Sequence, residues 1–544
     1  MTERIDAKVL VRLMQGSLDA LGRHREEINA LNVFPVPDGD TGTNMYLTMQ
    51  AVMEEVKRAG DSSMAAVCDA VARGSLMGAR GNSGVVLSQV LKGFTQVLKD
   101  HDTVGVRELS LALKRGSEVA YRAVMKPVEG TILTVVREAS EGGEEAAGET
   151  SELETWLAAV ARRARESLDR TPELLPVLKE AGVVDAGGMG FVVILEGMLS
   201  ALSGKDLEAV EEELAGGEVL PEPPGVTSTE DFRYELQFLL QCDDEDVEAF
   251  RRELALIGGS VLVVGGDGLY RVHLHTDRLG EAVELASARG RMRDVEITDL
   301  REQVESLRSE EAERESPGSV HSWQGQPGGV GVVAVSSGEG LREIFLSLGA
   351  GAVVEGGQSM NPSTAELLQA VDSLPQEQVI VLPNNKNIIP AAEQMKGLTR
   401  KEVMVIPTRS VMEGLTALVA MDGRASLAEN GERMSRAASG VRTGFLTHAV
   451  RDSRWSGGEV RKGYFIGLFR DGIVSHDEDL FRAAVGLLEA MLEEEDGELL
   501  TMILGEGFPE GMEERLRQKA EQKGLEVEVI RGGQPLYPLI LGLE

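Results

Sequence analysis

The sequence predicts a multidomain protein with an all-α N-terminal domain, a small α+β middle domain and an α/β C-terminal domain whose sheet is mainly parallel and doubly wound. Three observations support this fold class. Up to about residue 203, apolar residues recur at three- and four-residue spacing, as in "DAKVLVRLMQGSLDAL". From residue 232 onward, strand-like runs such as "FRYELQFLLQ" appear between helical segments. From residue 328 onward, buried-strand and helix patterns alternate.

Two polar stretches separate these domains. "GKDLEAVEEELAGGEVLPEPPG" is first acidic and then rich in Pro and Gly, which is typical of a linker. "SLRSEEAERESPGSVHSWQGQPGG" has a similar composition. The expected boundaries are 1–203 for the helical domain, 204–225 for a linker, 226–308 for the middle domain, 309–327 for a second linker and 328–544 for the C-terminal domain.

The parallel sheet of the last domain is predicted from one repeated unit. "GVGVVAVSS", "GAVVEGG", "QVIVLPNN" and "EVMVIPT" are short apolar runs that each end in a polar turn. Several are followed by helical patterns, such as "STAELLQAVDSL". Strands joined by helices run parallel. Further strands are expected in "RKGYFIGLFRDGIVS", "ELLTMILGE" and "LEVEVIRGGQPLYPLILGLE".

Composition excludes several classes of protein. The net charge of -35 argues against a nucleic-acid or anionic-membrane binder, because both need a basic face. Two cysteines in 544 residues exclude a disulfide framework. No apolar run reaches the roughly 18 residues of a membrane-spanning helix, and the N-terminus lacks the layout of a signal peptide. We therefore expect a soluble, cytoplasmic protein.

The stretch "NVFPVPDGDTGTNM" is the first candidate site. A turn at Gly39 would aim the carboxylates of Asp38 and Asp40 at one point, and hard cations such as Mg²⁺ take oxygen ligands of this kind. Asn32 could add a carbonyl oxygen from the preceding helix end. The alternative is an ordinary solvent turn in which Asp40 or Thr41 caps the next helix.

Three more glycine-rich helix starts occur in the same domain. "GARGNSGVVLSQ" places Asn82 and Ser83 at a helix start, where free N–H groups favour an anion. "KPVEGTILTV" repeats the arrangement with Gly130 and Thr131, and "GVVDAGGMGF" places Asp185 before a glycine-rich helix start. Each could be a plain cap or a close helix contact. Four such interruptions in one helical domain favour a phosphate-binding site.

These motifs resemble a known family. "NVFPVPDGDTGTNM", "GARGNSGVVLSQ", "KPVEGTILTV" and "LPVLKEAGVVDAGGMGF" resemble the nucleotide-binding domain of the dihydroxyacetone kinase L-subunit type. Their order, with "YRVHLHTDRLGEAVE", "LPNNKNIIPAA" and "GGQPLYPLI" downstream, resembles the catalytic subunit of bacterial fatty acid kinase over nearly the full length. The resemblance implies an antiparallel helical barrel at the N-terminus and a DegV-like C-terminal domain.

The resemblance also implies roles for matched positions. Asp38 and Asp40 match the metal-binding aspartates, and Asn32 stands near a third aspartate of the dihydroxyacetone kinases with the local spacing different by one residue. Asp185 lies near the nucleoside end. The implied phosphate-binding set is Thr43, Asn44, Asn82, Ser83, Gly84, Gly130 and Thr131. The implied cofactors are ATP and two Mg²⁺ ions.

The implied activity is phosphorylation of a fatty acid carboxylate, with the acid presented by a separate fatty-acid-binding protein that docks on the C-terminal domain. A carboxylate is already anionic at neutral pH and needs no general base. The motifs contain no histidine, which is consistent with such an acceptor. A polyol kinase of the dihydroxyacetone type and a non-catalytic nucleotide-binding regulator are the alternatives. By analogy we also expect a homodimer.

A second metal site is suggested by "RVHLHTD" in the middle domain. His273 and His275 are two residues apart on a predicted strand and therefore share a face. Glu235, on the facing "FRYELQF" strand, could complete a Zn²⁺ site, with Asp277 as another candidate. The resembling family tends to carry a cysteine at the place of Glu235, whereas Cys242 is offset from it. The alternative is a pair of hydrogen-bonded strand histidines.

Polar turns follow the predicted strands of the last domain. In open α/β sheets, ligands bind beyond the carboxyl ends of the strands. The side chains there are Asn384, Asn385, Lys386, Arg409 and Ser410. They are predicted either to face a polar partner or an anion, or only to cap helices.

Overall fold

The structure is a computed structural model of the chain. It describes residues 3–32, 39–124, 126–214, 234–242, 250, 253–254, 256–266, 269–299, 329–357, 361–449, 453–455, 458–461, 463–470, 472–494 and 497–544. The chain divides into two compact units. One contains Met1–Glu218 together with Val320–Glu544, and the other contains Val219–Ser319.

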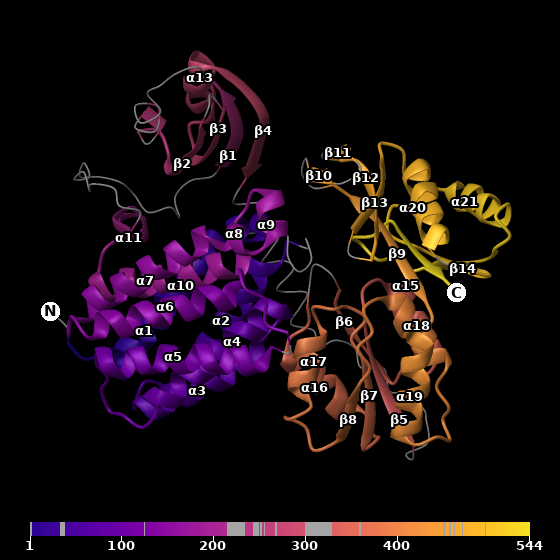
Figure 1. Ribbon diagram of the computed structural model, residues 1–544, viewed down its shortest axis with the longest axis horizontal. Helices are drawn as coiled ribbons and strands as arrows, with labels where there is room; N and C mark the ends of the chain where they lie inside the picture. Colours follow the sequence, from indigo (N-terminus) through magenta and orange to yellow (C-terminus); the bar gives the residue numbers. More distant parts are fainter. Residues whose placement is uncertain are drawn as a thin grey trace. The chain divides into compact units, whose positions relative to one another are not determined.

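The N-terminal part of the first unit is helical, as predicted (Figure 1). Each long helix packs against the next, and α10 packs on both α7 and α1, so the ring of helices closes. The predicted antiparallel helical barrel is therefore present. The helices are α1 (Ala7–Leu31), α2 (Thr41–Ala59), α3 (Met64–Gly78), α4 (Gly81–Leu98), α5 (Val106–Ala123), α6 (Ile132–Ala147), α7 (Leu153–Asp169), α8 (Thr171–Leu174), α9 (Pro176–Ala181), α10 (Ala186–Ser203) and α11 (Leu207–Leu214).

The ring closes where two glycines meet. A Cβ added to Gly16 of α1 would lie 2.5 Å from the carbonyl oxygen of Gly197 in α10, and a Cβ on Gly197 would lie 2.4 Å from the oxygen of Gly16. Real side chains do not approach so closely, so only glycine fits at this crossing. The first and last long helices of the barrel are thus in direct backbone contact.

Helix α10 is the apolar core of this domain. Within the described part of the chain it is the one helix that is long and apolar enough to cross a membrane, but 67% of that stretch is buried inside the protein. Its neighbours α1, α2, α6 and α7 cover it. Such burial is expected of a helix that is enclosed by neighbouring helices of the same domain.

Helix α11 lies in the stretch predicted to be a linker from residue 204. Leu207, Val210 and Leu214 recur at helical spacing and are buried in the core of the helical domain. The many glutamates of "LEAVEEEL" gave this segment the composition of a linker. The helical domain therefore extends at least to Leu214.

The second unit contains a four-stranded antiparallel sheet, which agrees with the predicted α+β middle domain. Its strands β1 (Tyr234–Gln241), β2 (Gly259–Gly266), β3 (Leu269–Thr276) and β4 (Arg291–Asp299) lie in the order β2-β3-β1-β4. Helix α13 (Leu279–Arg289) follows β3 and packs on the sheet through buried Ala282 and Ala286.

The C-terminal domain begins with a four-stranded parallel sheet. Its strands β5 (Val330–Ser336), β6 (Ala352–Glu355), β7 (Gln378–Leu382) and β8 (Glu402–Val405) correspond to the four predicted apolar runs. They lie in the order β6-β5-β7-β8, and all pairs are parallel. The accompanying helices are α15 (Glu339–Ser347), α16 (Thr364–Ser373), α17 (Ile389–Met395), α18 (Val411–Val419) and α19 (Leu427–Ala438).

The remaining strands form a second sheet of six strands in the order β13-β12-β9-β16-β14-β15. Only β14 and β15 pair in parallel there, so the parallel arrangement belongs to the first sheet. The elements are β9 (Arg442–His448), β12 (Phe465–Phe469), β13 (Gly472–Asp477), α20 (Leu480–Glu494), β14 (Leu499–Leu504), α21 (Met512–Glu521), β15 (Glu526–Arg531) and β16 (Leu539–Leu543). Strands β10 (Ser453–Trp455) and β11 (Gly458–Val460) pair separately.

Candidate active site

Four helices of the barrel begin at the same end. Because consecutive helices are antiparallel, α2, α4, α6 and α10 start where α1 finishes. The first N–H groups of a helix have no partner inside the helix and carry the positive end of its dipole. The positive ends of four helices therefore lie at this end of the barrel, and the predicted binding of phosphate there stays a prediction.

Asp40 is buried at the start of α2. It is the N-cap residue, it is 6% exposed, and its side chain makes no capping hydrogen bond to the helix. The preceding Gly39 has a φ of 65°, which confirms the predicted turn. Asp40 is thus not the plain helix cap of the alternative interpretation.

The other predicted magnesium ligands are less fully described. Asn32 is the C-cap of α1 and is 6% exposed, and its main-chain N–H donates to the oxygen of Asn29 at 3.1 Å. Asp38 lies outside the described residues. The roles of Asn32 and Asp38 as metal ligands stay predictions.

The start of α2 is fixed against the last turns of α1. The main-chain N–H of Thr43 donates to Asn29 Oδ1 at 3.1 Å, and Asn29 Nδ2 donates to Thr43 Oγ1 at 3.0 Å. Thr43 is therefore held by a side chain of α1. This pair sets the position of the first turn of α2, from which Asp40 and Asn44 project.

Glycines bring α4 close to α2. A Cβ on Gly81 would lie 2.5 Å from Asn44 Nδ2, and one on Gly84 would lie 2.5 Å from Thr48 Oγ1. Ser83 Oγ donates to Thr41 Oγ1 at 3.5 Å. The motif "GARGNSG" thus places Asn44 and Ser83 beside the starts of both helices, and their binding of phosphate stays a prediction.

Gly130, Thr131 and Asp185 occupy the starts of α6 and α10. Gly130 has a φ of 83°, and Thr131 Oγ1 donates to Val128 O at 2.8 Å. The carboxylate of Asp185 accepts from the N–H groups of Gly188, at 2.7 Å, and of Ile132. Asp185 therefore joins the starts of two helices.

The pKa of Asp185 is shifted by its surroundings. Burial raises this pKa to about 6, against the lowering effect of the two N–H donors. A contact of Asp185 with the nucleoside stays a prediction.

The C-terminal domain contributes residues that sequence patterns did not single out for this site. Asn361, just before α16, donates through Nδ2 to the carboxylate of Asp40. Arg80 Nη1 lies 3.0 Å from both the main-chain oxygen of Asn361 and Glu366 Oε2. The only signal in the sequence was the "NPST" turn before a helix, which by itself indicates a cap.

Asn82 faces the same domain. Its Nδ2 donates to Asn387 Oδ1 at 2.7 Å, so in this structure it contacts the "PNNKN" turn. Helices α4 and α17 pack against each other next to this contact. The starts of α2 and α4 are therefore covered by two turns of the α/β domain, at residues 361–363 and 384–388.

Most of the polar turn residues predicted in that domain have structural partners. Asn384 Nδ2 donates to Val335 O and its Oδ1 accepts from Thr408, both at 2.8 Å, which joins the ends of β5, β7 and β8. Ser410 caps α18 by accepting from Glu413 N, and Arg409 N donates to the Glu413 carboxylate. The capping interpretation therefore agrees with the structure for Ser410, whereas the Asn384 side chain joins strand ends and Arg409 contributes its main-chain N–H.

The structure describes only some of the residues of the two predicted metal sites. The described residues contain no cluster of three or more His, Cys, Asp or Glu side chains suited to a metal ion. In the middle domain, the backbone register places Glu235 directly opposite His275, and His273 opposite Gln237. The side chains of Glu235, His273 and His275 lie outside the description, so the zinc site stays a prediction.

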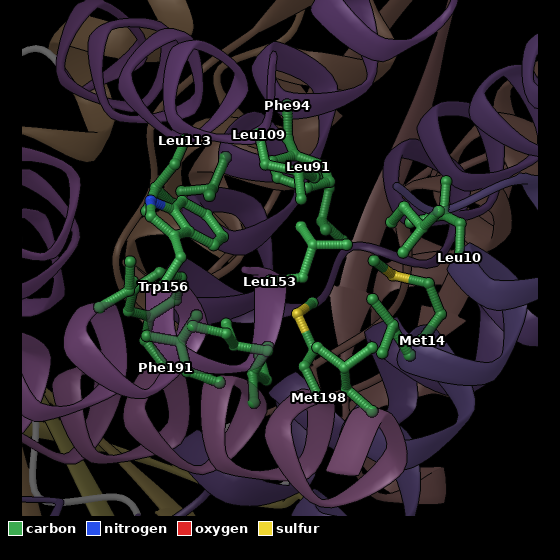
Figure 2. Close-up of a pocket in the computed structure, with 18 of the residues that line it drawn as sticks. Leu10, Met14, Leu91, Phe94, Leu109, Leu113, Leu153, Trp156, Phe191 and Met198 are labelled. Atoms are coloured by element: carbon green, nitrogen blue, oxygen red, sulfur yellow. The ribbon is translucent and has the colours of Figure 1, made fainter. Parts of the chain in front are cut away.

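An apolar cavity of about 60 Å³ lies toward the other end of the barrel (Figure 2). All of its lining residues are apolar, and Leu91, Phe94, Trp156, Phe191 and Met198 surround it. Trp156 Nε1 donates to Gly143 O at 2.9 Å, so its one polar group is paired. A cavity of about 150 Å³ is known to admit benzene, so this smaller one does not seat an acyl chain.

Comparison with known proteins shows which family combines these domains. The C-terminal and middle domains of the FakA-like fatty acid kinase family match residues 331–544 and 231–307, and the DAK2 domain matches residues 35–200. An uncharacterized protein of Staphylococcus haemolyticus is 37% identical over 556 residues, which is 100% of both chains. The chain belongs to the FakA-like fatty acid kinase family. The DAK2 domain of this FakA-like protein contains Asp40 and the four helix starts, and it identifies a kinase.

Solved structures resemble parts of this FakA-like chain. The dihydroxyacetone kinase of C. freundii is 18% identical with a TM-score of 0.28. The match covers 36% of this chain and 34% of the dihydroxyacetone kinase chain. A DegV family protein from Thermus thermophilus, whose structure is described as showing fatty acid binding, is 14% identical with a TM-score of 0.31. It covers 40% of this chain and 100% of its own.

Proposed function

We propose that this chain is an ATP- and Mg²⁺-dependent kinase that phosphorylates the carboxylate of a fatty acid presented by a separate fatty-acid-binding protein. The observation that carries this proposal is that α2, α4, α6 and α10 begin at one end of the barrel, where Asp40 and Asn44 are buried at the start of α2. Anionic phosphates are stabilised by such N-termini, and the chain belongs to a fatty acid kinase-like family.

The donor groups of the site fit a magnesium-bound triphosphate. Asp40 supplies a buried carboxylate, and Asp38 is the second expected ligand, with Asn32 nearby in the chain. Oxygen donors of this type are those that Mg²⁺ prefers. Asp40, with Asp38 and Asn32, would hold the Mg²⁺, which would offset the negative charge of the phosphates.

The protein's part in the reaction is positioning. The remaining free N–H groups at the starts of α2 and α4 would bind the phosphates, and Ser83 and Asn44 would donate further hydrogen bonds to them. A fatty acid carboxylate oxygen attacks the γ-phosphorus, the bond from phosphorus to the β–γ bridging oxygen breaks, and ADP leaves. The acceptor is already deprotonated, so no general base is required.

The size of the apolar cavity favours a separate carrier for the acyl chain. The apolar cavity of about 60 Å³ in the barrel is too small for a fatty acid and lies away from Asp40. We propose that the C-terminal domain docks the carrier, that the protein acts in the cytoplasm, where ATP is available, and that two copies of the chain associate. Light scattering of the purified protein tests the last point.

A structural zinc ion in the middle domain is a separate proposal. It rests on the register that places Glu235 opposite His275, with His273 two residues away on the same strand. Metal analysis of the purified chain and of the His273→Ala/His275→Ala variant tests it. Equal zinc content in both proteins would exclude this site.

The deciding experiment measures ADP release from Mg-ATP by the full chain with a fatty acid, with and without a candidate fatty-acid-binding protein. We expect release that needs both the acid and the carrier. Release with dihydroxyacetone alone would instead identify a polyol kinase. Nucleotide binding without release under any condition would leave a regulator.

A further inference from the structure

Asn361 is a buried residue of the C-terminal domain that reaches the kinase site. It is 1% exposed, and its Nδ2 donates to Asp40 Oδ2. Its main-chain oxygen accepts from Arg80 Nη1 at 3.0 Å, and two residues later Ser363 begins the cap of α16. The side chain is therefore held in place from both the helical and the α/β side.

The other end of this amide has no partner. Asn361 Oδ1 is buried and accepts no hydrogen bond from the described residues. Buried polar atoms without partners are uncommon in folded proteins and call for an explanation. A strong acceptor lying beside a carboxylate, in a site that attracts metal and phosphate, is suited to a cation.

Gly81 allows a second amide to approach the same point. A Cβ at Gly81 would lie 2.5 Å from Asn44 Nδ2 and 3.4 Å from Asn361 Nδ2. Two side-chain amides from different domains, and the Asp40 carboxylate bonded to one of them, thus surround the start of α4. Any larger residue at Gly81 would fill the space that they share.

We propose that Asn361 belongs to the metal–nucleotide site and that its side-chain oxygen is a ligand of the divalent cation held by Asp40. A side-chain amide presents either its NH₂ group or its oxygen after a half turn. Without a cation, the NH₂ group of Asn361 donates to the carboxylate of Asp40. With a cation bound to that carboxylate, the amide oxygen can coordinate the cation instead. This inference rests on the proposed function.

A consequence is that the α/β domain completes the kinase site. Asn361 lies 321 positions after Asp40 in the chain. Thr364 N also donates to Ala79 O at 3.2 Å, so the turn that carries Asn361 is fixed next to the start of α4. The domain proposed to dock the carrier would then contribute directly to metal binding.

The test compares Mn²⁺ binding, measured by electron paramagnetic resonance in the presence of ATP, and Mg-ATP binding, measured by calorimetry, in the full chain. Asn361→Ala is expected to weaken both about tenfold, the effect typical of losing a supporting ligand. Gln394→Ala is the matched control, because Gln394 Nε2 bonds Ser88 Oγ at 3.3 Å across the same two domains but farther along α4. The control should change binding less than twofold.

A second variant separates a ligand from a simple interdomain bond. Asn361→Asp places a carboxylate against Asp40, so its melting temperature should fall without divalent cations and recover with Mg²⁺ by more than the wild type gains. Absence of this extra Mg²⁺ recovery would overturn the proposal. This measurement also decides the matter if Asn361→Ala does not fold.

The remaining outcomes are distinct. Unchanged or tighter binding in Asn361→Ala would overturn the role of Asn361 and leave the proposed function intact. A wild-type chain that binds neither Mn²⁺-ATP nor Mg-ATP would overturn the proposed function, and the role of Asn361 with it.

Discussion

The two ends of the helical barrel differ although the same helices build both. Helix α4 starts at Gly81 beside Asn44, and about three to four turns later its Leu91 and Phe94 line a purely apolar cavity. Helix α10 likewise starts under the buried carboxylate of Asp185 and continues into Phe191, Ile194 and Met198 of the same cavity. Polar groups thus concentrate at the helix starts, and apolar packing fills the rest.

This difference indicates that residues at the start of each helix serve binding, whereas residues farther along the helix serve stability. At the site end, glycines and amides keep helix starts close and N–H groups available. At the other end, burial of leucines and aromatic rings stabilises the ring of helices. Substitutions at the two ends should therefore affect different measurements.

The largest effect is expected at Asp40. Asp40→Ala should lower phosphoryl transfer at least about a thousandfold, because a charge-stabilising group at the reacting phosphates is lost. The protein should still fold, because the carboxylate does not cap α2, but its melting temperature should fall modestly, because buried Asn361 Nδ2 loses its acceptor. Coupled ADP-release assays and thermal melting measure both.

The control for Asp40 is Asp69→Asn, which removes the charge of an exposed aspartate paired with Lys99 in the same domain. It should leave turnover unchanged. Wild-type turnover in Asp40→Ala would remove this end of the barrel from the proposed mechanism.

The apolar end should respond in the opposite way. Trp156→Ala removes a buried ring and enlarges the cavity, so the free energy of unfolding should fall by about 3–5 kcal/mol. Mg-ATP affinity of the folded fraction should stay the same. Denaturant titration measures the first quantity and calorimetry the second.

The matched control is Leu111→Ala on α5, whose side chain is 56% exposed, and which should cost little stability. Weakened nucleotide binding in folded Trp156→Ala would show that the two ends are coupled.

Alanine substitutions at two glycines allow a direct comparison of the two ends of the barrel. Gly81 and Gly204 both have positive φ, 55° and 73°, so alanine strains the backbone at either position. A Cβ at Gly81 meets Asn44 at 2.5 Å, whereas a Cβ at Gly204, beyond the end of α10, meets nothing within 4 Å. Gly81→Ala should therefore weaken Mg-ATP binding about tenfold, while Gly204→Ala should only lower stability, by about 1 kcal/mol.

Equal nucleotide affinity in the two glycine variants, measured by calorimetry, would show that the close approach of α4 to Asn44 has no role in binding.

The smallest predicted effect is a pH dependence of the stability, and it comes from His24 of α1. Burial lowers the pKa of His24, but its ion pair with Glu211 at 2.9 Å and its hydrogen bond with Glu27 at 2.7 Å outweigh burial and raise the pKa to about 10. The folded protein holds the proton more tightly than the unfolded chain, whose histidine has a pKa near 6.5. This stabilisation is complete below pH 6.5 and is lost as the pH rises through about 10.

Unfolding of wild type and His24→Gln at pH 6, 8 and 10 measures this contribution. The difference between them should be about 1–2 kcal/mol at pH 6 and should shrink toward pH 10, because charge-assisted hydrogen bonds of the imidazolium are lost. A difference that is independent of pH would exclude a charged His24.

Sequence patterns predicted the elements better than their partners. The periodicity indicated the helices of the barrel, and the four apolar runs indicated β5 to β8, because these patterns are local. The order β9-β16-β14 could not be read, since it pairs strands whose spacing in the chain carries no pattern. Helix α11 was hidden by its glutamates, which dominate its composition but leave Leu207, Val210 and Leu214 facing inward.

Those parts of the site that depend on local motifs were predictable, and those that depend on contacts between domains were not. The turn at Gly39 and the grouping of Asn44 with Ser83 follow from local motifs. Asn361 and Arg80 were missed because their roles depend on which loop of the α/β domain lies against α4, and no local pattern encodes that.

The contact between Gly16 and Gly197 has a consequence for synthesis on the ribosome. Helix α1 emerges first, but its partner in the ring is the last long helix of the domain. At about 5–20 residues per second, Gly16 waits roughly 10–40 s for Gly197 to be made. During that time the part of α1 that packs on α10 has no native cover, although α2 can already pack on α1, so nascent chains stalled before α10 should be the form most dependent on chaperones.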